Sequence, residues 1–242
     1  MLIESFDNAK VKEWKKLKTR KYREKTNKFL VEGMHLVLEA YKLGYIEELI
    51  LEKNELLPLN VEITYVTREI IDSISTLTTP VNVMAVCRKI KEREKLGDRL
   101  LVIDGIQDPG NLGTLIRSAV AFNIDTVILG NGTVDVYNPK CVRSSQGMLF
   151  HVNIIRRDLL TFLPELSNNN YLILGTKVTY GKNAKELIDV SKFALVMGNE
   201  GSGISEETEE LCDEFLYIKT NENCESLNVT VACSIILYQL SL

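Results

Sequence analysis

Two side chains with useful chemistry follow a short apolar run near the middle of the chain. Residues 100–103 are all apolar, the turn-forming sequence Asp-Pro-Gly-Asn ends at Asn111, and apolar residues then recur at helical spacing from Leu112 to Ala119. This order predicts a strand, a polar loop and a helix. Such loops bind ligands in α/β sheets, and this one offers the amide of Asn111 and the permanent cation of Arg117. Taken alone, Asn111 could instead cap the helix and Arg117 could be a solvated surface residue.

Two further stretches could contribute to the same site. Residues 198–203 read Gly-Asn-Glu-Gly-Ser-Gly, in which three glycines allow close approach to a ligand and Glu200 supplies a carboxylate. The spacing is that of neither a dinucleotide fingerprint nor a phosphate loop. Residues 225–232 open a last helix that is expected to run to about Leu240, with Ser226 as its N-cap and free backbone N–H groups at its start. Taken singly, a plain turn and a core helix would explain these two stretches.

The second part of the chain has the pattern of a parallel sheet. Six apolar runs recur at intervals of a little over twenty residues, with helical stretches between them: residues 100–103, 126–129, 149–154, 171–174, 193–197 and 215–218. This alternation predicts an α/β fold, with right-handed crossovers and helices on both faces of the sheet. Several runs end in Gly or Asn, so their carboxyl ends are expected to line one crevice.

The first part of the chain reads as a smaller α/β unit. Helices are predicted over residues 8–28, 34–42 and 68–75, and strands over residues 28–33, 46–51, 62–66 and 81–87. A charged segment with almost no apolar periodicity follows. We therefore predict three parts: a domain over residues 1–90, a linker over residues 91–99 and a second domain over residues 100–242.

Charge is distributed unevenly along the chain. The formal net charge is −4, but Lys10 to Lys28 holds ten Lys or Arg against two Glu, with Trp14 and Tyr22 among them. Such a block attracts phosphates, and we favour a nucleic-acid contact over a merely solvated helix face. The candidate RNA-binding residues are Lys15, Lys16, Lys18, Arg20, Lys21 and Arg23.

Composition bounds the class of protein. No apolar run approaches the length of a membrane span, and the first residues lack a signal-peptide core, so a cytoplasmic location is expected. The five cysteines form no Cys-x-x-Cys pair, which indicates buried reduced thiols and predicts no metal site.

Together, the three chemistry-bearing stretches resemble the motifs of the SpoU (TrmH) family of RNA ribose 2′-O-methyltransferases, within the SPOUT superfamily. The family's first motif matches residues 108–117, its Gly-x-Glu-x-x-Gly motif matches residues 198–203, and its Ser-Leu-Asn-Val motif matches residues 226–229. Residues 142–150 resemble the family's connecting helix and strand, and residues 29–33 resemble its ribosomal-protein-like substrate-binding domain. The likeness covers nearly the whole chain.

The resemblance implies a parallel-sheet domain with a carboxy-terminal trefoil knot, a homodimer, and S-adenosylmethionine (AdoMet) as the methyl donor. Methyl transfer to a 2′-hydroxyl of structured RNA is expected, with rRNA favoured and tRNA possible. The implied catalytic residues are Asn111, Arg117, Glu200, Ser226 and Asn228. The implied cofactor-binding residues are Thr176, Gly198, Gly201, Ile218 and Leu227.

Two other interpretations remain open at this point. One is an RNA-binding or assembly protein that has the fold without the chemistry, against which the intact motif residues argue. The other is a nucleotide-dependent α/β enzyme such as a dehydrogenase, against which the missing dinucleotide fingerprint argues. The chain also departs from the family at residues 219–224, where Pro and Gly are usual and Lys-Thr-Asn-Glu-Asn-Cys stands instead.

Overall fold

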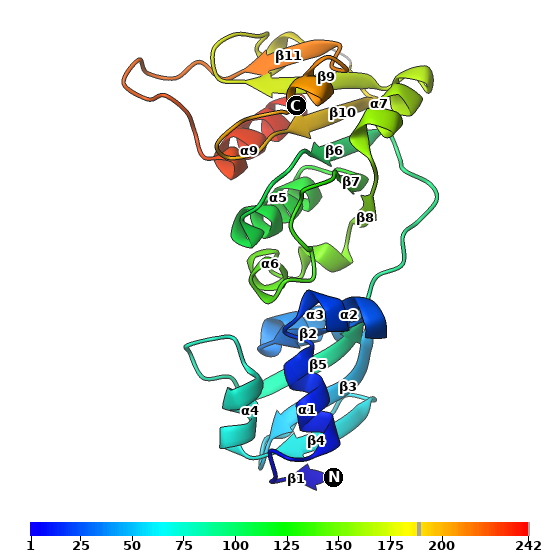
Figure 1. Ribbon diagram of the computed structural model, residues 1–242, viewed down its shortest axis with the longest axis vertical. Helices are drawn as coiled ribbons and strands as arrows, with labels where there is room; N and C mark the ends of the chain where they lie inside the picture. The colour runs from blue at the N-terminus through cyan, green and yellow to red at the C-terminus, as the bar shows by residue number, and fades with distance from the viewer. Residues whose placement is uncertain (188–189, 242) are drawn as a thin grey trace. The chain divides into compact units, whose positions relative to one another are not determined.

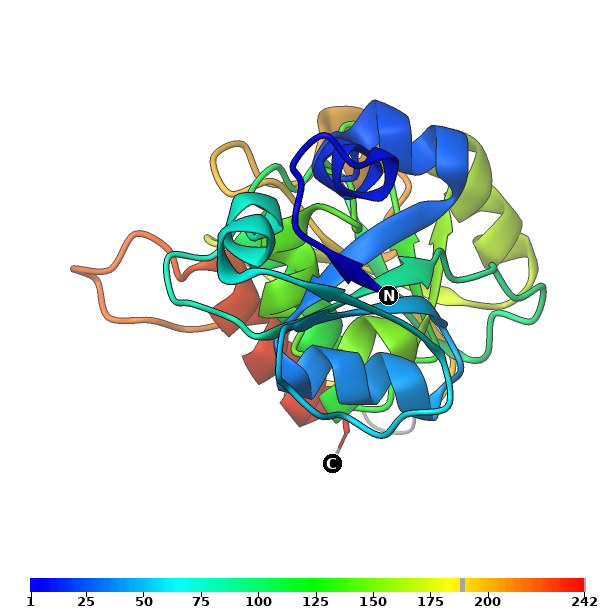
Figure 2. The same cartoon turned by 90° about the horizontal axis from the view of Figure 1, so that it is seen from below.

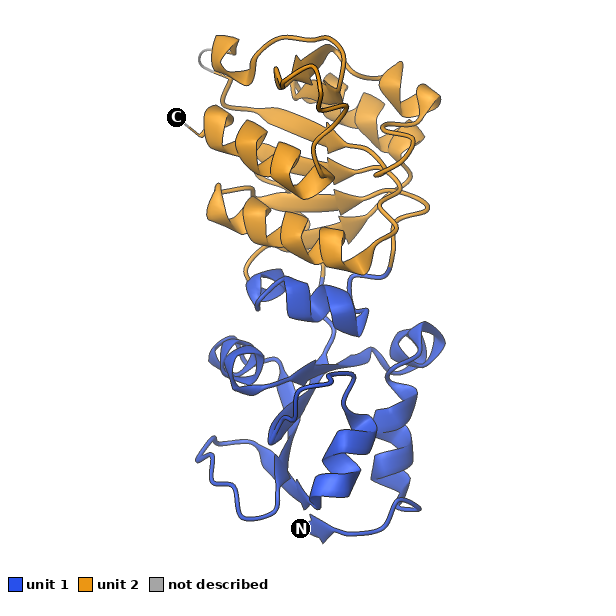
Figure 3. Cartoon of the chain, turned by 90° about the vertical axis from the view of Figure 1, so that its left-hand side faces the viewer, with its two compact units in different colours: residues 1–91, 135–150 blue, residues 92–134, 151–242 orange. Residues whose placement is uncertain are grey.

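The computed structural model describes residues 1–187 and 190–241, which form two compact units (Figure 3). Residues 1–91 and 135–150 make up the first unit, and residues 92–134 together with the remainder after residue 150 make up the second. The segment 135–150 follows a strand of the second unit in sequence but packs with the first. The chain therefore passes from one unit to the other three times.

A five-stranded mixed sheet forms the centre of the first unit (Figure 1). Its order is β1-β4-β3-β5-β2, with β5 antiparallel to both β2 and β3. The strands are β1 (Leu2–Ile3), β2 (Lys28–Glu32), β3 (Ile46–Glu52), β4 (Glu62–Val66) and β5 (Val83–Arg88). The helices are α1 (Ala9–Lys16), α2 (Arg20–Thr26), α3 (Met34–Lys42), α4 (Arg68–Ile74), α6 (Pro139–Ser144) and the 3-10 helix η1 (Met148–Phe150). The small α/β unit predicted from the sequence is thus present.

Helices cover both faces of this sheet, with α1 and α4 on one side and α3 on the other (Figure 2). Val11 and Trp14 of α1 join Ile70 and Ile71 of α4 in one core cluster over the inward residues of the strands. Trp14 is only 2% exposed. The predicted helix over residues 8–28 is therefore two helices, because Leu17 turns into the core and Thr19 starts α2.

A buried arginine fastens the segment 135–150 to the first unit. The Nε and Nη2 groups of Arg23 donate hydrogen bonds to Oδ2 of Asp135, at 3.1 and 2.6 Å. Its Nη1 donates to the carbonyl oxygens of Leu17 and Lys18, both at 2.8 Å. The Arg23 side chain is 3% exposed, so a buried charge is matched by a carboxylate and two carbonyls, as burial requires.

Aromatic packing completes the attachment of this segment. The ring of Phe29 on β2 lies 4.7 Å from the ring of Tyr137 and 6.1 Å from that of Phe150. The apolar run at 149–154 that predicts a strand is therefore divided. Phe150 ends a 3-10 turn against the first unit, and the strand begins only at Asn153.

The second unit is a six-stranded sheet in which every neighbouring pair is parallel, as predicted. Its order is β11-β9-β10-β6-β7-β8 (Figure 1). The strands are β6 (Arg99–Ile103), β7 (Thr126–Leu129), β8 (Asn153–Arg156), β9 (Leu172–Lys177), β10 (Phe193–Met197) and β11 (Glu214–Tyr217). The helices are α5 (Pro109–Ala121), α7 (Leu159–Asn168), the 3-10 helix η2 (Ala184–Glu186), α8 (Glu206–Glu209) and α9 (Val229–Leu240).

Both faces of this sheet are covered, again as predicted. Leu159, Leu163 and Leu166 of α7 join one core cluster with alternate strand residues such as Leu100 and Val102. Helices α5 and α9 pack side by side, and the hydroxyls of Ser118 and Ser234 form a hydrogen bond of 2.8 Å between them. The last helix begins at Val229 with Asn228 as its N-cap, so the expected cap at Ser226 is wrong by two residues.

The charged segment before β6 is held along the amino-terminal edge of this sheet. Asn153 exchanges two hydrogen bonds with the backbone of Arg93, at 2.8 and 3.2 Å. Thr126 donates to the carbonyl of Leu96 at 2.6 Å, and Asp125 accepts from the backbone N–H of Asp98 at 2.9 Å. From Glu92 onward, the segment therefore belongs to the second unit and is hydrogen-bonded to it.

Candidate active site

Asn111 and Glu200 meet at the carboxyl edge of the parallel sheet. Asp108 caps α5 by accepting from the backbone N–H of Asn111 at 2.9 Å, so the Asn111 side chain is not the cap. Its Nδ2 instead donates to Oε1 of Glu200 at 2.9 Å. The backbone N–H of Asp108 points at the same oxygen, at 3.4 Å. The first and second motifs are therefore joined by a side-chain hydrogen bond 89 residues apart in sequence.

The glycine loop after β10 is shaped by a residue that the sequence analysis missed. Asn199 donates through Nδ2 to the carbonyl of Gly105 at 2.8 Å, while its Oδ1 accepts from the N–H of Gly201, also at 2.8 Å. Its backbone pairs with Gly203 in both directions, at 2.8 and 3.0 Å. Asn199 thus closes the loop and ties it to the first motif. Its position between a glycine and the motif glutamate was the only signal available in the sequence.

A cavity of about 540 Å³ lies beside this loop. It is lined by the ends of β9 and β10, the chain after β11 and the start of α9. All five predicted cofactor residues line it: Thr176, Gly198, Gly201, Ile218 and Leu227. Three of the predicted catalytic residues also line it: Glu200, Ser226 and Asn228. The carboxyl ends of β9 and β10 and the chain after β11 therefore share one crevice, whereas the ends of β6 and β7 do not line it, and Asn111 reaches it through Glu200.

Arg117 stands apart from this cavity. It is exposed on α5, and within residues 1–187 and 190–241 it makes no hydrogen bond or ion pair. Asn228 is partly engaged, because its Oδ1 accepts from the backbone N–H of Thr230 at 2.9 Å and from the Thr230 hydroxyl at 2.6 Å. The structure thus gathers the carboxylate and amide groups and leaves the guanidinium free for a ligand.

Lys177 is a second residue that sequence reasoning missed. It lines the cavity at the end of β9, where its ammonium bonds a carboxylate oxygen of Glu209 and the Tyr180 hydroxyl. It also lies 4.6 and 4.8 Å from the ring centroids of Tyr180 and Phe215. The bond to Glu209 raises the pKa of Lys177 above its usual value. Lys177 therefore fixes three segments around the cavity by charge and cation–π contact.

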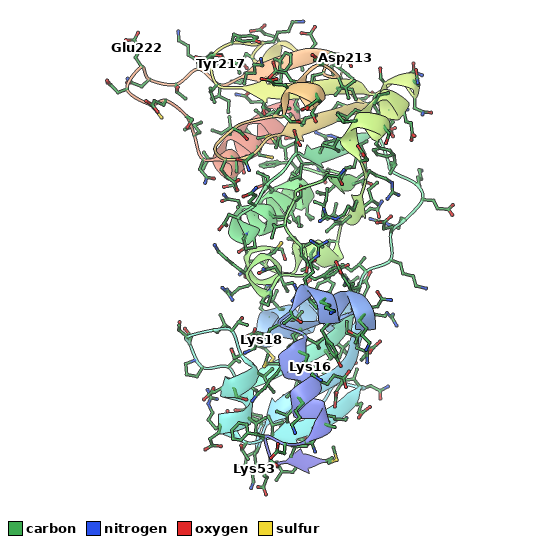
Figure 4. The ribbon with its side chains drawn as sticks, viewed as in Figure 1. Lys16, Lys18, Lys53, Asp213, Tyr217 and Glu222 are labelled. Carbon is green, nitrogen blue, oxygen red and sulfur yellow. The ribbon has the colours of Figure 1, made fainter. Side chains whose placement is uncertain are left out.

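The chain leaves the sheet in a long loop before α9. This loop is the segment that departs from the family pattern, and Glu222 lies on its projecting part (Figure 4). The carbonyl of Cys224 accepts from the Thr220 hydroxyl at 3.3 Å, and residues 225–228 then return to line the cavity. The atypical segment thus projects at Glu222 but contributes Thr220 to the cavity lining, and the motif residues that follow it line the same cavity.

The six predicted RNA-binding side chains in the first unit differ in their environments. Arg23 is buried and fully engaged with Asp135 and two carbonyls, so its charge is directed inward. Lys18 donates to the carbonyls of Ser73 and Ser75, both at 3.1 Å, and Arg20 pairs with Glu24. Lys15, Lys16 and Lys21 pair with no carboxylate in the part of the chain that the structure describes. The aromatic Trp14 is buried, so it is not part of a surface contact.

None of the helices in the ranges 1–187 and 190–241 is long and apolar enough to cross a membrane. Over the same ranges, no three His, Cys, Asp or Glu side chains gather as a metal-binding group would require.

The parallel α/β unit brings a glycine loop, an Asn–Glu pair and the start of α9 to one edge of its sheet. The sequence matches the model of the SpoU rRNA Methylase family over residues 98–238 and that of the MRM3-like substrate binding domain over residues 8–85. The chain belongs to the SpoU rRNA methylase family.

Individual relatives extend over nearly the whole chain. The 23S rRNA (guanosine(2553)-2′-O)-methyltransferase RlmP of Bacillus subtilis is 42% identical over 98% of this chain and 98% of its own. The AdoMet-bound rRNA methyltransferase of Sinorhizobium meliloti superposes with a TM-score of 0.88 at 25% identity, covering 99% of this chain and 97% of its own. The SpoU methyltransferase AviRb of Streptomyces viridochromogenes, in complex with AdoMet, gives a TM-score of 0.86 at 25% identity and 97% coverage of both chains.

Proposed function

We propose that this protein transfers a methyl group from AdoMet to a ribose 2′-hydroxyl of ribosomal RNA. The observation that carries the proposal is the hydrogen bond between Asn111 and Glu200 beside a cavity lined by all five predicted cofactor residues. The family and the rRNA methyltransferase relative support the same reaction.

The cavity fits a cofactor of this size and chemistry. Its volume of about 540 Å³ is in the range of small-molecule sites. The apolar side chains of Ile218 and Leu227 would pack against the adenosyl group of AdoMet, and the backbone of the glycine loop from Gly198 to Gly203 lines the same cavity. When bound there, AdoMet supplies an electrophilic methyl group on a sulfonium.

The roles of the polar residues follow from their chemistry. In an in-line displacement the C–S bond breaks as the new O–C bond forms, and the hydroxyl proton must leave. Asn111 holds one oxygen of the Glu200 carboxylate, which places a proton acceptor beside the cavity. The guanidinium of Arg117 pairs with the neighbouring phosphate and stabilises negative charge that develops on the 2′-oxygen. Ser226 and Asn228 orient the ribose from the start of α9.

We also propose that two copies of the chain assemble as a homodimer through α9. Val231, Ile235 and Tyr238 recur at helical spacing on this helix, and Val231 and Tyr238 are 46% and 53% exposed. The Tyr238 ring lies 6.1 Å from that of Phe122, the C-cap residue of α5, which extends the apolar surface. Such a surface marks an interface. Light scattering of the wild type and of Tyr238→Glu tests this: a dimer that the substitution breaks is expected, and a wild-type monomer would refute it.

The substrate and the remaining fold features are proposed from the relatives. A guanosine of 23S rRNA is the first nucleotide to test, because the 42% identical relative is named for that reaction. A tRNA substrate is the alternative. A protein that modifies rRNA would act in the cytoplasm, and the carboxy-terminal trefoil knot stays a prediction, as do the domain limits at residues 90 and 100.

The decisive experiment measures labelled methyl transfer from AdoMet to rRNA and tRNA from a strain that lacks this protein. We expect transfer to the rRNA by the wild type and none by Arg117→Ala. Arg93→Ala is the matched control, because Arg93 is also exposed but lies at the opposite edge of the same sheet. Mapping the product to a ribose confirms the reaction, and absence of both transfer and AdoMet binding refutes it.

A second measurement separates the two possible roles of Arg117. Lys can titrate but cannot form the two parallel bonds of a guanidinium with a phosphate. We expect Arg117→Lys to lose activity at every pH. Retained activity with a shifted pH profile would instead identify a titrating base.

A further inference from the structure

The structure divides the ten basic side chains between Lys10 and Lys28 into two sets. Six are held by partners within the first unit. Lys10 pairs with Glu48 and Glu62, Lys12 with Asp7, Arg20 with Glu24, Arg23 with Asp135 and Lys28 with Glu47, while Lys18 donates to two carbonyls. Over the described ranges, the other four have neither a carboxylate nor a carbonyl partner: Lys15, Lys16, Lys21 and Lys25. The positive charge available to a phosphate therefore comes from the end of α1 and from α2.

Two aromatic rings accompany these free cations. The Nζ of Lys15 lies 4.8 Å from the centroid of the Phe6 ring, and that of Lys16 lies 5.7 Å from the Tyr22 ring. Tyr22 is half-buried and packs on the core of the unit. Phe6 is 49% exposed, whereas other phenylalanines such as Phe29 and Phe193 are fully buried. Lys16, the last residue of α1, is labelled in Figure 4.

An exposed phenylalanine next to unpaired lysines fits a particular ligand. Bases that are not paired in a helix stack on aromatic side chains, and adjacent lysines neutralise their phosphates. A paired RNA helix offers no exposed base face to such a ring except at its ends, and an acidic protein surface would use the lysines without the ring. The pairing of ring and cations therefore favours a single-stranded stretch of RNA.

We propose that Phe6 is a stacking platform for an unpaired base of the substrate RNA, with Lys15 and Lys16 on the phosphates beside it. The inference rests on the proposed function for the identity of the ligand as RNA. It adds that the first unit recognises a loop, bulge or end and not only the charge of the backbone.

The test measures the affinity of the full chain for oligouridylate and for a long RNA duplex, which has few ends for its length, at several salt concentrations. Phe6→Ala is expected to weaken oligouridylate binding about 5- to 150-fold, the cost of one lost base stack, without changing the salt dependence. Duplex affinity should not change. The slope of log K against log salt concentration is negative. Lys15→Ala and Lys16→Ala should each make it shallower by about 0.7, because each removes one phosphate contact.

Three further variants make the result specific. Phe6→Trp should retain the affinity, and oligouridylate should quench the fluorescence of the new tryptophan as a base stacks on it. The native Trp14 is buried, so its own fluorescence should not respond. Phe6→Leu keeps an apolar side chain but loses the ring, and it should behave like Phe6→Ala. Leu56→Ala is the matched control for an exposed apolar residue of the same unit, since Leu56 is 86% exposed, and it should have no effect.

Unchanged oligouridylate affinity in Phe6→Ala overturns the proposal, and so does an equal loss on the duplex. Failure of the proposed function is distinguishable from both outcomes. It would appear as a wild-type protein that transfers no methyl group to rRNA, whatever the effect of Phe6→Ala on oligouridylate binding.

Discussion

Replacing Gly198 by Ala should disrupt the glycine loop, and the reason is purely geometric. A Cβ at this position would lie 2.1 Å from the carbonyl carbon of Gly203, 2.2 Å from the nitrogen of Ile204 and 2.4 Å from the oxygen of Gly203. All three atoms belong to the backbone, so no side-chain rotation can relieve the overlap. The loop between Asn199 and Gly203 must open instead.

The cost can be estimated from what the opening removes. Overpacking of this kind costs about 1–3 kcal/mol. Loss of the two backbone hydrogen bonds between Asn199 and Gly203 adds about 0.5–1.5 kcal/mol for each bond. We therefore expect a loss of at least about 2 kcal/mol in the free energy of unfolding of the second unit, which lowers its Tm by about 4–8 °C. AdoMet binding should be lost with the loop.

The same loop supplies matched controls. A Cβ on Gly201 would meet only Oδ1 of Asn199, at 3.6 Å, so Gly201→Ala should leave the Tm within about 2 °C of the wild type. Gly203 has room for a Cβ but a φ of +75°, so Gly203→Ala should cost about 1–2 kcal/mol through backbone strain. The expected order of destabilisation is Gly198, then Gly203, then Gly201.

Calorimetric unfolding and titration with AdoMet measure both effects. The reasoning is refuted if Gly198→Ala and Gly201→Ala unfold at the same temperature. It is also refuted if Gly198→Ala binds AdoMet as tightly as the wild type does.

Three other expectations follow from contacts elsewhere. Asp135→Asn should destabilise the first unit by about 3 kcal/mol in denaturant unfolding, because the buried Arg23 loses its charge partner; an unchanged midpoint would contradict this. Lys177→Met should weaken AdoMet binding about tenfold in calorimetry, because a charge-assisted bond to Glu209 is lost, and Lys177→Arg should keep most of the affinity. A thiol reagent at neutral pH should label Cys224 first, since Cys87, Cys141 and Cys233 are buried and burial raises the pKa of Cys212 to about 12. Peptide mapping that finds Cys212 labelled first would contradict this.

The sequence specified the parallel sheet well because its signals are local. The strands Thr126–Leu129 and Phe193–Met197 and the helix Met34–Lys42 lie at the predicted residues. Each is an apolar or periodic run bounded by glycine or by charged residues, and nothing distant is needed to define it. The gathering of the three motifs at one edge then follows from the topology of a parallel sheet.

Features set by distant contacts could not be derived in the same way. Whether Arg23 binds RNA or a buried partner depends on Asp135, which is 112 residues away in sequence. The run that includes Phe150 is apolar because it packs on Phe29 and Tyr45, which periodicity cannot distinguish from a strand. The cap of α5 is instead a local ambiguity, because Asp108 and Asn111 both have side chains that can cap a helix, and only the structure places Asp108 in that role.

The three passages of the chain between the units also determine how this protein can be dissected. A fragment cut at residue 91 would lack Asp135, Tyr137 and Phe150, and so would expose Phe29 and leave Arg23 as a buried cation without its carboxylate. The complementary fragment would carry residues 135–150 with their apolar side chains uncovered. The two parts are thus not interchangeable modules, and a chimera with another substrate-binding domain would have to exchange residues 135–150 along with it.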